Sequence, residues 1–92
     1  MRVTWSPRAL QQIERATDYL AEFNPRAAVR LAEGMVAAGD SLAHFPHSGR
    51  PVHGTTMREL VTAFPYIIRY RVVRDTVRIL RVRHTSRQPT NP

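Results

Sequence analysis

Apolar residues recur every three to four positions through the first half of the chain, which is the spacing of an amphipathic helix. Ser6-Pro7 precedes the first series, and Asn24-Pro25 separates it from the second. Serine and asparagine are favoured N-caps, and proline is tolerated at the first helical position. Residues 7–43 are therefore predicted to form an antiparallel hairpin of two helices. The two apolar series are Leu10, Ile13, Thr17, Leu20 and Phe23, then Ala28, Leu31, Ala32, Met35, Val36, Gly39 and Leu42.

Four other segments are predicted to be extended. Residues 2–5 (RVTW) form a short strand, and residues 58–62 (RELVT) form another. Residues 66–73 and 76–84 are rich in Val, Ile and Tyr, which is typical of strands. The expected fold is α+β in the order β-α-α-β-β-β. It has a three-stranded antiparallel meander, and the helices lie on one face of the sheet.

The rest of the chain has the composition of loops. Residues 44–57 are rich in Pro, Gly, Ser and Thr, and we expect Phe45 to anchor this loop to the core. Residues 85–92 contain two prolines and are expected to form a frayed tail. The sequence contains no internal repeat or linker, so we expect one domain over residues 1–92.

The last two predicted strands are joined at Arg74-Asp75. A two- or four-residue connection places Arg71 opposite Arg78, and Val72 opposite Val77, whereas a three-residue loop would shift this register. Side chains alternate between the two faces of a sheet, so one face of the hairpin is expected to lie on the helices. That face holds Ile68, Tyr70, Val72, Val77 and Ile79. The other face is expected to be open and holds Ile67, Arg69, Arg71, Val73, Arg78, Leu80, Val82 and His84.

The charge pattern suggests that the open face binds a partner. The net charge is +7, and all fourteen basic residues are arginines. Guanidinium groups favour planar contacts with carboxylates and phosphates, so an acidic partner is expected. Two arginines placed directly opposite each other on a sheet repel unless a partner neutralises them. The open face is therefore either a docking surface for a partly apolar, partly anionic partner or a half-exposed sheet with solvated arginines.

Several classes of protein are excluded or disfavoured by composition. Without cysteine there is no disulfide framework and no thiolate metal site. No apolar stretch approaches the ~20 residues that a membrane span needs, and no secretory signal is visible. We therefore expect a soluble, cytoplasmic protein that does not bind membranes.

Candidate catalytic and metal sites are few. His44, His47 and His53 lie in one predicted loop without metal-ligand spacing, so we expect neither a metal nor a cofactor. No Gly-rich phosphate loop or nucleophile elbow is present. His84 and Arg87 lie at the end of the last strand, where a general acid and a phosphate-binding cation could act together on RNA. A structural role for these two residues remains the alternative.

The order of these elements resembles the RelE/ParE superfamily of bacterial toxins over nearly the whole chain. The segments that carry the resemblance are WSPRALQQIERATDYLAEFNPRAA, HFPHSGRP, RELV, PYIIRYRV and VRILRVRHTSR. The resemblance implies the toxin of a type II toxin–antitoxin pair. It also implies an antitoxin that wraps the toxin and contacts both the helix hairpin and the sheet, in a hetero-oligomeric complex.

The superfamily contains two mechanisms, and the residues favour the ParE-like one. RelE-like members cleave mRNA on the ribosome with basic residues of the open sheet face, whereas ParE-like members inhibit DNA gyrase. Many RNA-cleaving relatives have an arginine at the position occupied here by Ile67, and the lysines of RelE have no counterpart in this chain. Arg87 matches a catalytic arginine after the last strand, and His84 lies close to where some relatives have a histidine.

Three functions follow as hypotheses. The first is a non-enzymatic toxin that inhibits DNA gyrase and is neutralised by a cognate antitoxin with an acidic or amphipathic segment. The second is a ribosome-dependent endoribonuclease, and the third is a small nucleic-acid-binding module without toxicity. In the first case, antitoxin or target binds Ile67, Arg69, Arg71, Arg78, Leu80 and Val82. In the second, catalysis falls to His84, Arg81, Arg83 and Arg87.

Overall fold

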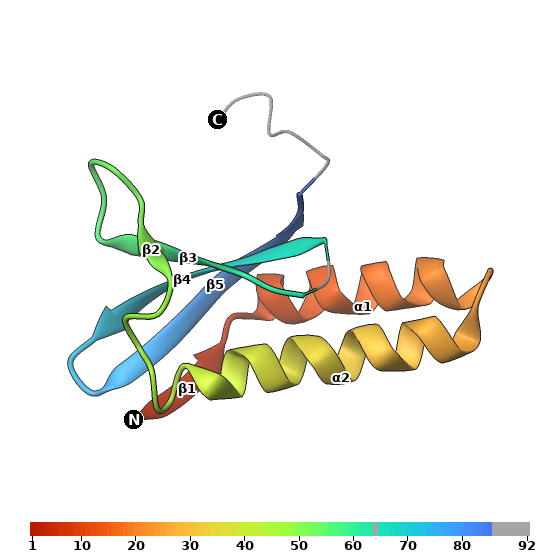
Figure 1. The fold of residues 1–92 in the computed structure, drawn as a ribbon, viewed down its shortest axis with the longest axis horizontal. Coiled ribbons are helices and arrows are strands. Elements are labelled where there is room, and N and C mark those ends of the chain that lie inside the picture. The colour runs from red at the N-terminus through yellow and green to blue at the C-terminus, as the bar shows by residue number, and fades with distance from the viewer. Residues whose placement is uncertain (64, 86–92) are drawn as a thin grey trace.

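The computed structural model describes residues 1–63 and 65–85, and Figure 1 shows a helix hairpin lying along one side of a twisted sheet. The helices are α1 (Pro7–Ala21) and α2 (Pro25–Ser41). The strands are β1 (Arg2–Trp5), β2 (Arg50–Pro51), β3 (Met57–Val61), β4 (Tyr66–Val73) and β5 (Thr76–His84). The α+β class, the helix hairpin and the antiparallel meander are confirmed. The expected tail lies outside the described residues, apart from Thr85.

The sheet is larger than the sequence indicated. Its strand order is β1-β5-β4-β3-β2, and β1 pairs with β5 in parallel, with Val3 beside Val77. Residues 50 and 51, predicted as loop, pair with β3 and extend the sheet. Pro51 has no N–H to offer a further strand, which explains why pairing ends here.

Both helices begin where the sequence predicts. The Ser6 hydroxyl accepts a hydrogen bond from the N–H of Ala9, and the Asn24 side chain accepts one from the N–H of Ala27. Pro7 and Pro25 stand at the first helical positions. The two prolines lack the N–H groups that would have no intrahelical partner at these positions.

The core lies between the helix hairpin and the sheet. Its buried residues come from both layers, and the aromatic ring of Trp5 packs against it from β1. The end of the hairpin that carries the α1–α2 turn extends beyond the sheet (Figure 1). The core residues are Ala9, Leu31, Met35, Leu42, Ile68, Tyr70, Val77, Ile79 and Val82.

The loop between α2 and β3 is anchored by Tyr70 rather than by Phe45. Phe45 is 67% exposed, so the prediction that it enters the core is wrong. The buried Tyr70 hydroxyl donates a hydrogen bond to the carbonyl of Pro46 (2.8 Å) and accepts one from the N–H of Gly49 (2.9 Å). A phenol that reaches two backbone groups holds the loop without an apolar anchor.

The register of the β4–β5 hairpin is the predicted one near the turn. Arg71 lies opposite Arg78, and Val72 opposite Val77, across a two-residue connection at Arg74-Asp75. Among the described residues, no helix is long and apolar enough to cross a membrane.

Candidate cationic interface

The face of the sheet turned away from the helices carries a ladder of arginine side chains, and we call it the open face. Arg69 lies opposite Arg81, and Arg71 opposite Arg78, in the β4–β5 pairing. Directly paired residues share a face, so these side chains come from two strands onto one surface. The arginines of the open face are Arg2, Arg50, Arg69, Arg71, Arg78, Arg81 and Arg83.

A buried carboxylate lies among these arginines. Glu59 of β3 is 6% exposed and pairs in register with Arg69. Its Oε2 accepts hydrogen bonds from Nε (3.0 Å) and Nη2 (2.5 Å) of Arg69 and lies 3.6 Å from Nη2 of Arg83. Its Oε1 lies 3.9 Å from Nη2 of Arg50. One acidic side chain thus attracts three cations from three different strands.

The arginines determine the charge state of Glu59. Burial acts to raise the pKa of this carboxyl, but the hydrogen bond from Arg69 and the positive charges of Arg69, Arg83 and Arg50 outweigh burial. The pKa of Glu59 is therefore held below its ordinary value. Glu59 stays ionised at neutral pH and partly neutralises the centre of the open face.

The surroundings of Arg81 disfavour its charged form, in contrast to those of Glu59. Its Nε is buried and has no hydrogen-bond partner among the described residues. Burial lowers the pKa of its guanidinium, and the charges of Arg8, Arg69 and Arg83 lower it further. Arg8 lies in the first turn of α1, so that helix adds a cation beside the sheet. Positive charge is therefore in excess around Arg81.

A β-bulge changes the face assignment at the end of β5. The pairing passes from Tyr70 opposite Ile79 to Arg69 opposite Arg81, which leaves Leu80 as the extra residue. Beyond the bulge the alternation is reversed, so Val82 packs in the core opposite Ile68. The predicted placement of Val82 and His84 on the open face is therefore wrong.

The bulge is stabilised by the side chains of Ser6, the N-cap of α1, and of Gln12 within this helix. Ser6 donates its hydroxyl hydrogen to the carbonyl of Leu80 (2.7 Å), and Gln12 Oε1 accepts a hydrogen bond from the N–H of Val82 (2.6 Å). Both bonds satisfy backbone groups of β5 beyond the end of β1, where no strand is available to pair with them.

The residues predicted to bind antitoxin or target differ in how accessible they are on the open face. Arg69, Arg71 and Arg78 lie on the open face, where Arg71 and Arg78 are exposed. Leu80 is half-buried and lines a groove with Arg71 and Arg78. Ile67 lies on this face but is only 6% exposed, so little of its side chain remains for a partner to cover.

The residues of the alternative RNase site lie on two sides of β5. Arg81 and Arg83 belong to the open face, as their pairing with Arg69 and Ile67 indicates. His84 pairs with Tyr66 on the helix side, where the two rings meet edge to face with centroids 5.0 Å apart. It lines a hollow there with Gln12, Arg15, Tyr19 and Arg83. Arg87 lies outside the described residues.

The members of this site that the sequence analysis missed are Glu59, Arg2, Arg8 and Arg50. The signal for Glu59 was available, because pairing RELV against IIRY in register places Glu59 directly across from Arg69. Arg8 gave no such signal, since its approach to Arg81 depends on how α1 crosses the sheet. In the described residues, no group of three or more His, Cys, Asp or Glu side chains is placed to hold a metal ion.

Comparison with known proteins identifies the family. A family model described as "ParE toxin of type II toxin-antitoxin system, parDE" matches residues 3–89. The chain belongs to the ParE toxin family. It is accordingly a toxin of a type II toxin–antitoxin system, and such a system implies a cognate antitoxin.

Individual relatives agree with this membership. Toxin RelE2 of Caulobacter vibrioides is 44% identical over 86 residues, covering 94% of this chain and 97% of the relative. Putative toxin Y4kP of Sinorhizobium fredii is 43% identical over 88 residues, covering 95% and 91%. A solved structure of the chromosomal ParDE system from P. aeruginosa matches with a TM-score of 0.83 at 21% identity, covering 94% of this chain and 97% of that one. At that identity the match bears on the fold alone.

Proposed function

We propose that this ParE-family toxin acts without catalysis, by binding and inhibiting DNA gyrase, and that its antitoxin silences it by covering the open face and the helix hairpin. The observation that carries the proposal is the position of His84 on the helix side of β5, on the opposite face from Arg81 and its partner Arg69. A general acid and the cations meant to serve the same phosphate need to converge on it. Among the described residues, Arg81 lies on the opposite face from His84, and Arg83 is the one proposed catalytic cation that lines a hollow with it.

The surface left by this arrangement suits binding. The open face offers exposed arginines at Arg71 and Arg78 beside the half-buried Leu80. Interfaces commonly combine arginine with a few apolar contacts. An acidic segment of the antitoxin, or of gyrase, can neutralise these cations.

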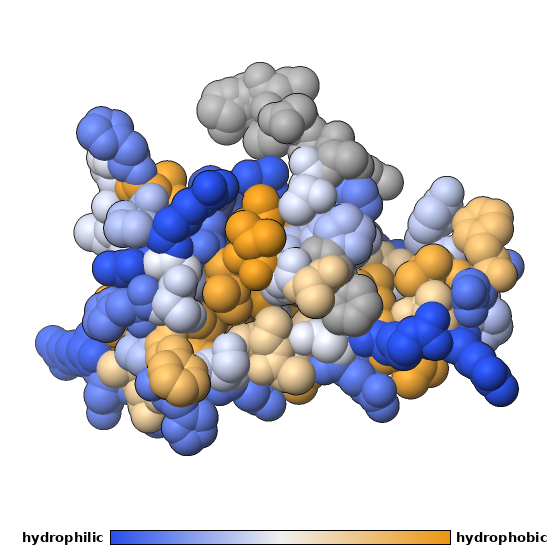
Figure 2. All heavy atoms as spheres, viewed as in Figure 1, coloured by the Kyte–Doolittle hydropathy of each residue, from blue (hydrophilic) through white to orange (hydrophobic). Residues whose placement is uncertain are grey.

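The helix hairpin offers a second, apolar surface for the antitoxin. Tyr19 and Phe23 are 64% and 69% exposed, and their rings pack edge to face with centroids 5.2 Å apart. Leu10, Val29 and Val36 are also exposed on the helices. Figure 2 shows hydrophobic patches along this part of the molecule. An amphipathic antitoxin segment can bury them, which supports a partner that contacts both layers.

The test measures two activities with the same purified toxin. In a DNA supercoiling assay we expect inhibition of gyrase that rises with toxin concentration and is reversed by the antitoxin. In a ribosome-dependent mRNA assay we expect no cleavage. The variant His84→Ala should inhibit gyrase as the wild type does. Cleavage of mRNA without any inhibition of supercoiling would overturn the proposal.

One observation favours the endoribonuclease as a second candidate. Glu59, Arg69 and Arg83 place a carboxylate beside two cations, and the relatives at 44% and 41% identity carry the name RelE. Glu59 would remove the proton of a 2′-hydroxyl whose oxygen attacks the adjacent phosphorus, and the 5′-oxygen would leave as its bond to phosphorus breaks, taking a proton from solvent. Against this, a carboxyl with a lowered pKa is a weak base. Loss of mRNA cleavage in Glu59→Gln, with cleavage kept in His84→Ala, would support this candidate.

A further inference from the structure

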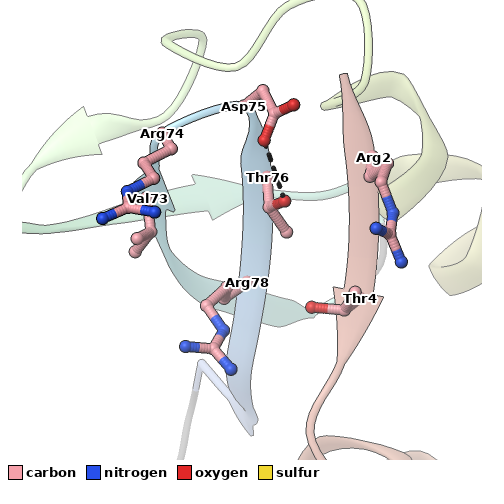
Figure 3. Close-up of a pocket in the computed structure, with 7 residues that line it drawn as sticks. All are labelled: Arg2, Thr4, Val73, Arg74, Asp75, Thr76 and Arg78. Atoms are coloured by element: carbon pink, nitrogen blue, oxygen red, sulfur yellow. Dashed lines mark hydrogen bonds between the residues drawn. The ribbon is translucent and has the colours of Figure 1, made fainter.

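A shallow hollow lies beside the β4–β5 turn, at one end of the sheet. Figure 3 shows Arg2 and Arg74 on either side of β5, with Arg78 between them. Arg71, directly opposite Arg78, extends this group. We call Arg2, Arg71, Arg74 and Arg78 the tip arginines, and all four are exposed. The hollow is lined by Arg2, Thr4, Val73, Arg74, Asp75, Thr76 and Arg78.

Positive charge at the tip is not neutralised as it is around Glu59. Asp75 is the acidic residue of the lining, and its carboxylate accepts a long hydrogen bond from the hydroxyl of Thr76 (3.5 Å). The ion pairs found among the described residues all involve Glu59. Figure 2 shows hydrophilic residues gathered at this end of the molecule. The tip therefore presents four arginines beside one carboxylate, so positive charge is in excess there.

The backbone conformation of the β4–β5 turn is unfavourable for Arg74. Arg74 has φ of 57°, in the left-handed region that glycine or asparagine occupies at little cost. For another residue this conformation costs on the order of 1–2 kcal/mol. A strained position that presents a guanidinium at the end of the hairpin suggests that the charge has a use.

We propose that the tip arginines form a contact surface for the phosphodiester backbone of duplex DNA. Contacts to phosphate need cations and hydroxyl donors rather than apolar pockets, and Thr4 and Thr76 supply hydroxyls beside the arginines. A protein partner would be expected to bury an aromatic or aliphatic centre. Val73 is the sole aliphatic residue among those that line the hollow, and none of them is aromatic.

The form of the surface favours a duplex over a single strand. Single-strand binding relies on aromatic side chains against which bases stack, and the lining of this hollow provides none. The β4–β5 hairpin is flanked by β1, which pairs with β5 from Thr76, and by β3, which pairs with β4 as far as Arg71, so its turn projects little from the sheet. The tip arginines come from three adjacent parts of the sheet and form a broad surface that can contact phosphates along a duplex without entering a groove. Because Arg71 and Arg78 also belong to the proposed gyrase contact, DNA binding is tested without gyrase.

The test uses the full-length toxin and a fluorescently labelled 20-base-pair DNA duplex, with anisotropy measured from 50 to 200 mM salt. The test variant combines Arg74→Gly, which suits the turn, with Arg78→Gln. The control combines Arg26→Gln with Arg30→Gln, two exposed arginines of α2, and removes the same charge. Thermal unfolding followed by circular dichroism verifies that both variants fold.

We expect the tip variant to bind about tenfold more weakly at the lowest salt concentration. The plot of log K against log salt concentration has a negative slope, and each lost phosphate contact makes it less steep by about 0.9. Two lost contacts should therefore make it less steep by roughly 1.8. The control should keep the slope of the wild type. Absence of binding at 50 mM salt, or an equal loss in both variants, would overturn the inference. Equal or tighter tip-dependent binding of duplex RNA would overturn the assignment to DNA.

Discussion

Oε2 of Glu59 accepts both hydrogen bonds that Arg69 directs toward it, one from Nε and one from Nη2. The other carboxylate oxygen faces Arg50. The buried carboxylate on the open face thus has its charge balanced by cations from neighbouring strands. This arrangement neutralises the centre of the face and leaves Arg71 and Arg78 exposed near the turn.

Glu59→Gln is expected to destabilise the fold at neutral pH. The amide keeps the shape of the side chain but leaves Arg69 without an anionic partner. Hydrogen bonds to charged groups contribute about 1.5–3 kcal/mol, so the free energy of unfolding should fall by about that amount. Urea unfolding measures it. Glu33→Gln is a matched control, because Glu33 is exposed on α2 and its loss should change stability by less than about 0.5 kcal/mol.

The same carboxyl makes stability depend on pH. Because the folded-state pKa of Glu59 lies below its unfolded value, its contribution is fully present above the unfolded pKa of about 4.3. The contribution is lost as the pH falls through the folded-state pKa. The difference in unfolding free energy between wild type and Glu59→Gln should therefore be constant near neutrality and shrink below pH ~4. A difference that stays constant down to acid pH would contradict the lowered pKa.

The hairpin register was predictable from the sequence, and the bulge was not. Alternating residues around Arg74-Asp75 determine the pairing of Arg71 with Arg78, because a shift of one residue would expose the core face. The bulge at Leu80 depends on Ser6 and Gln12, which lie 74 and 70 positions away from their hydrogen-bond partners along the chain. Local periodicity carries no information about such partners.

The anchor of the loop between α2 and β3 and the edge strand β2 were also not predictable from local sequence patterns. Phe45 was expected in the core on hydrophobicity alone, yet the loop is anchored by hydrogen bonds from the buried Tyr70 hydroxyl. Strand β2 is only two residues long and gains its hydrogen bonds from β3. In each case a contact between distant segments outweighs local preference.

Tyr70→Phe tests the anchor of the loop. The variant keeps the buried ring but removes the hydroxyl, so the carbonyl of Pro46 and the N–H of Gly49 lose their partner. We expect a loss of about 1–3 kcal/mol in unfolding free energy. Proteolysis within residues 44–57 should also be faster. Tyr66→Phe is the control, and it should leave cleavage of this loop unchanged.

Gly39→Ala tests the close approach of α2 to β1. A Cβ at this position would overlap Cζ2 of Trp5 and meet Cδ1 of Ile79 at 3.0 Å. Alanine is the better helix former, but overpacking a core costs about 1–3 kcal/mol and should outweigh that gain. Trp5→Phe removes the overlapping atoms. In a double-mutant cycle measured by thermal unfolding, the alanine should be less costly in the phenylalanine background. Additive effects would argue against the contact.

Arg71→Gln combined with Arg78→Gln separates the proposed toxicity from folding. These residues are directly opposite each other, and like charges in that relation are destabilising, so the variant should unfold at the same or a slightly higher urea concentration. If the open face binds gyrase, affinity for the purified enzyme without DNA should fall about tenfold, equivalent to about 1.4 kcal/mol. Measuring this binding in the absence of DNA keeps the result separate from contact between the tip arginines and a duplex. The control is Arg26→Gln with Arg30→Gln, which removes the same charge from α2. Unchanged binding, or an equal loss in the control, would show that gyrase does not bind through these two arginines.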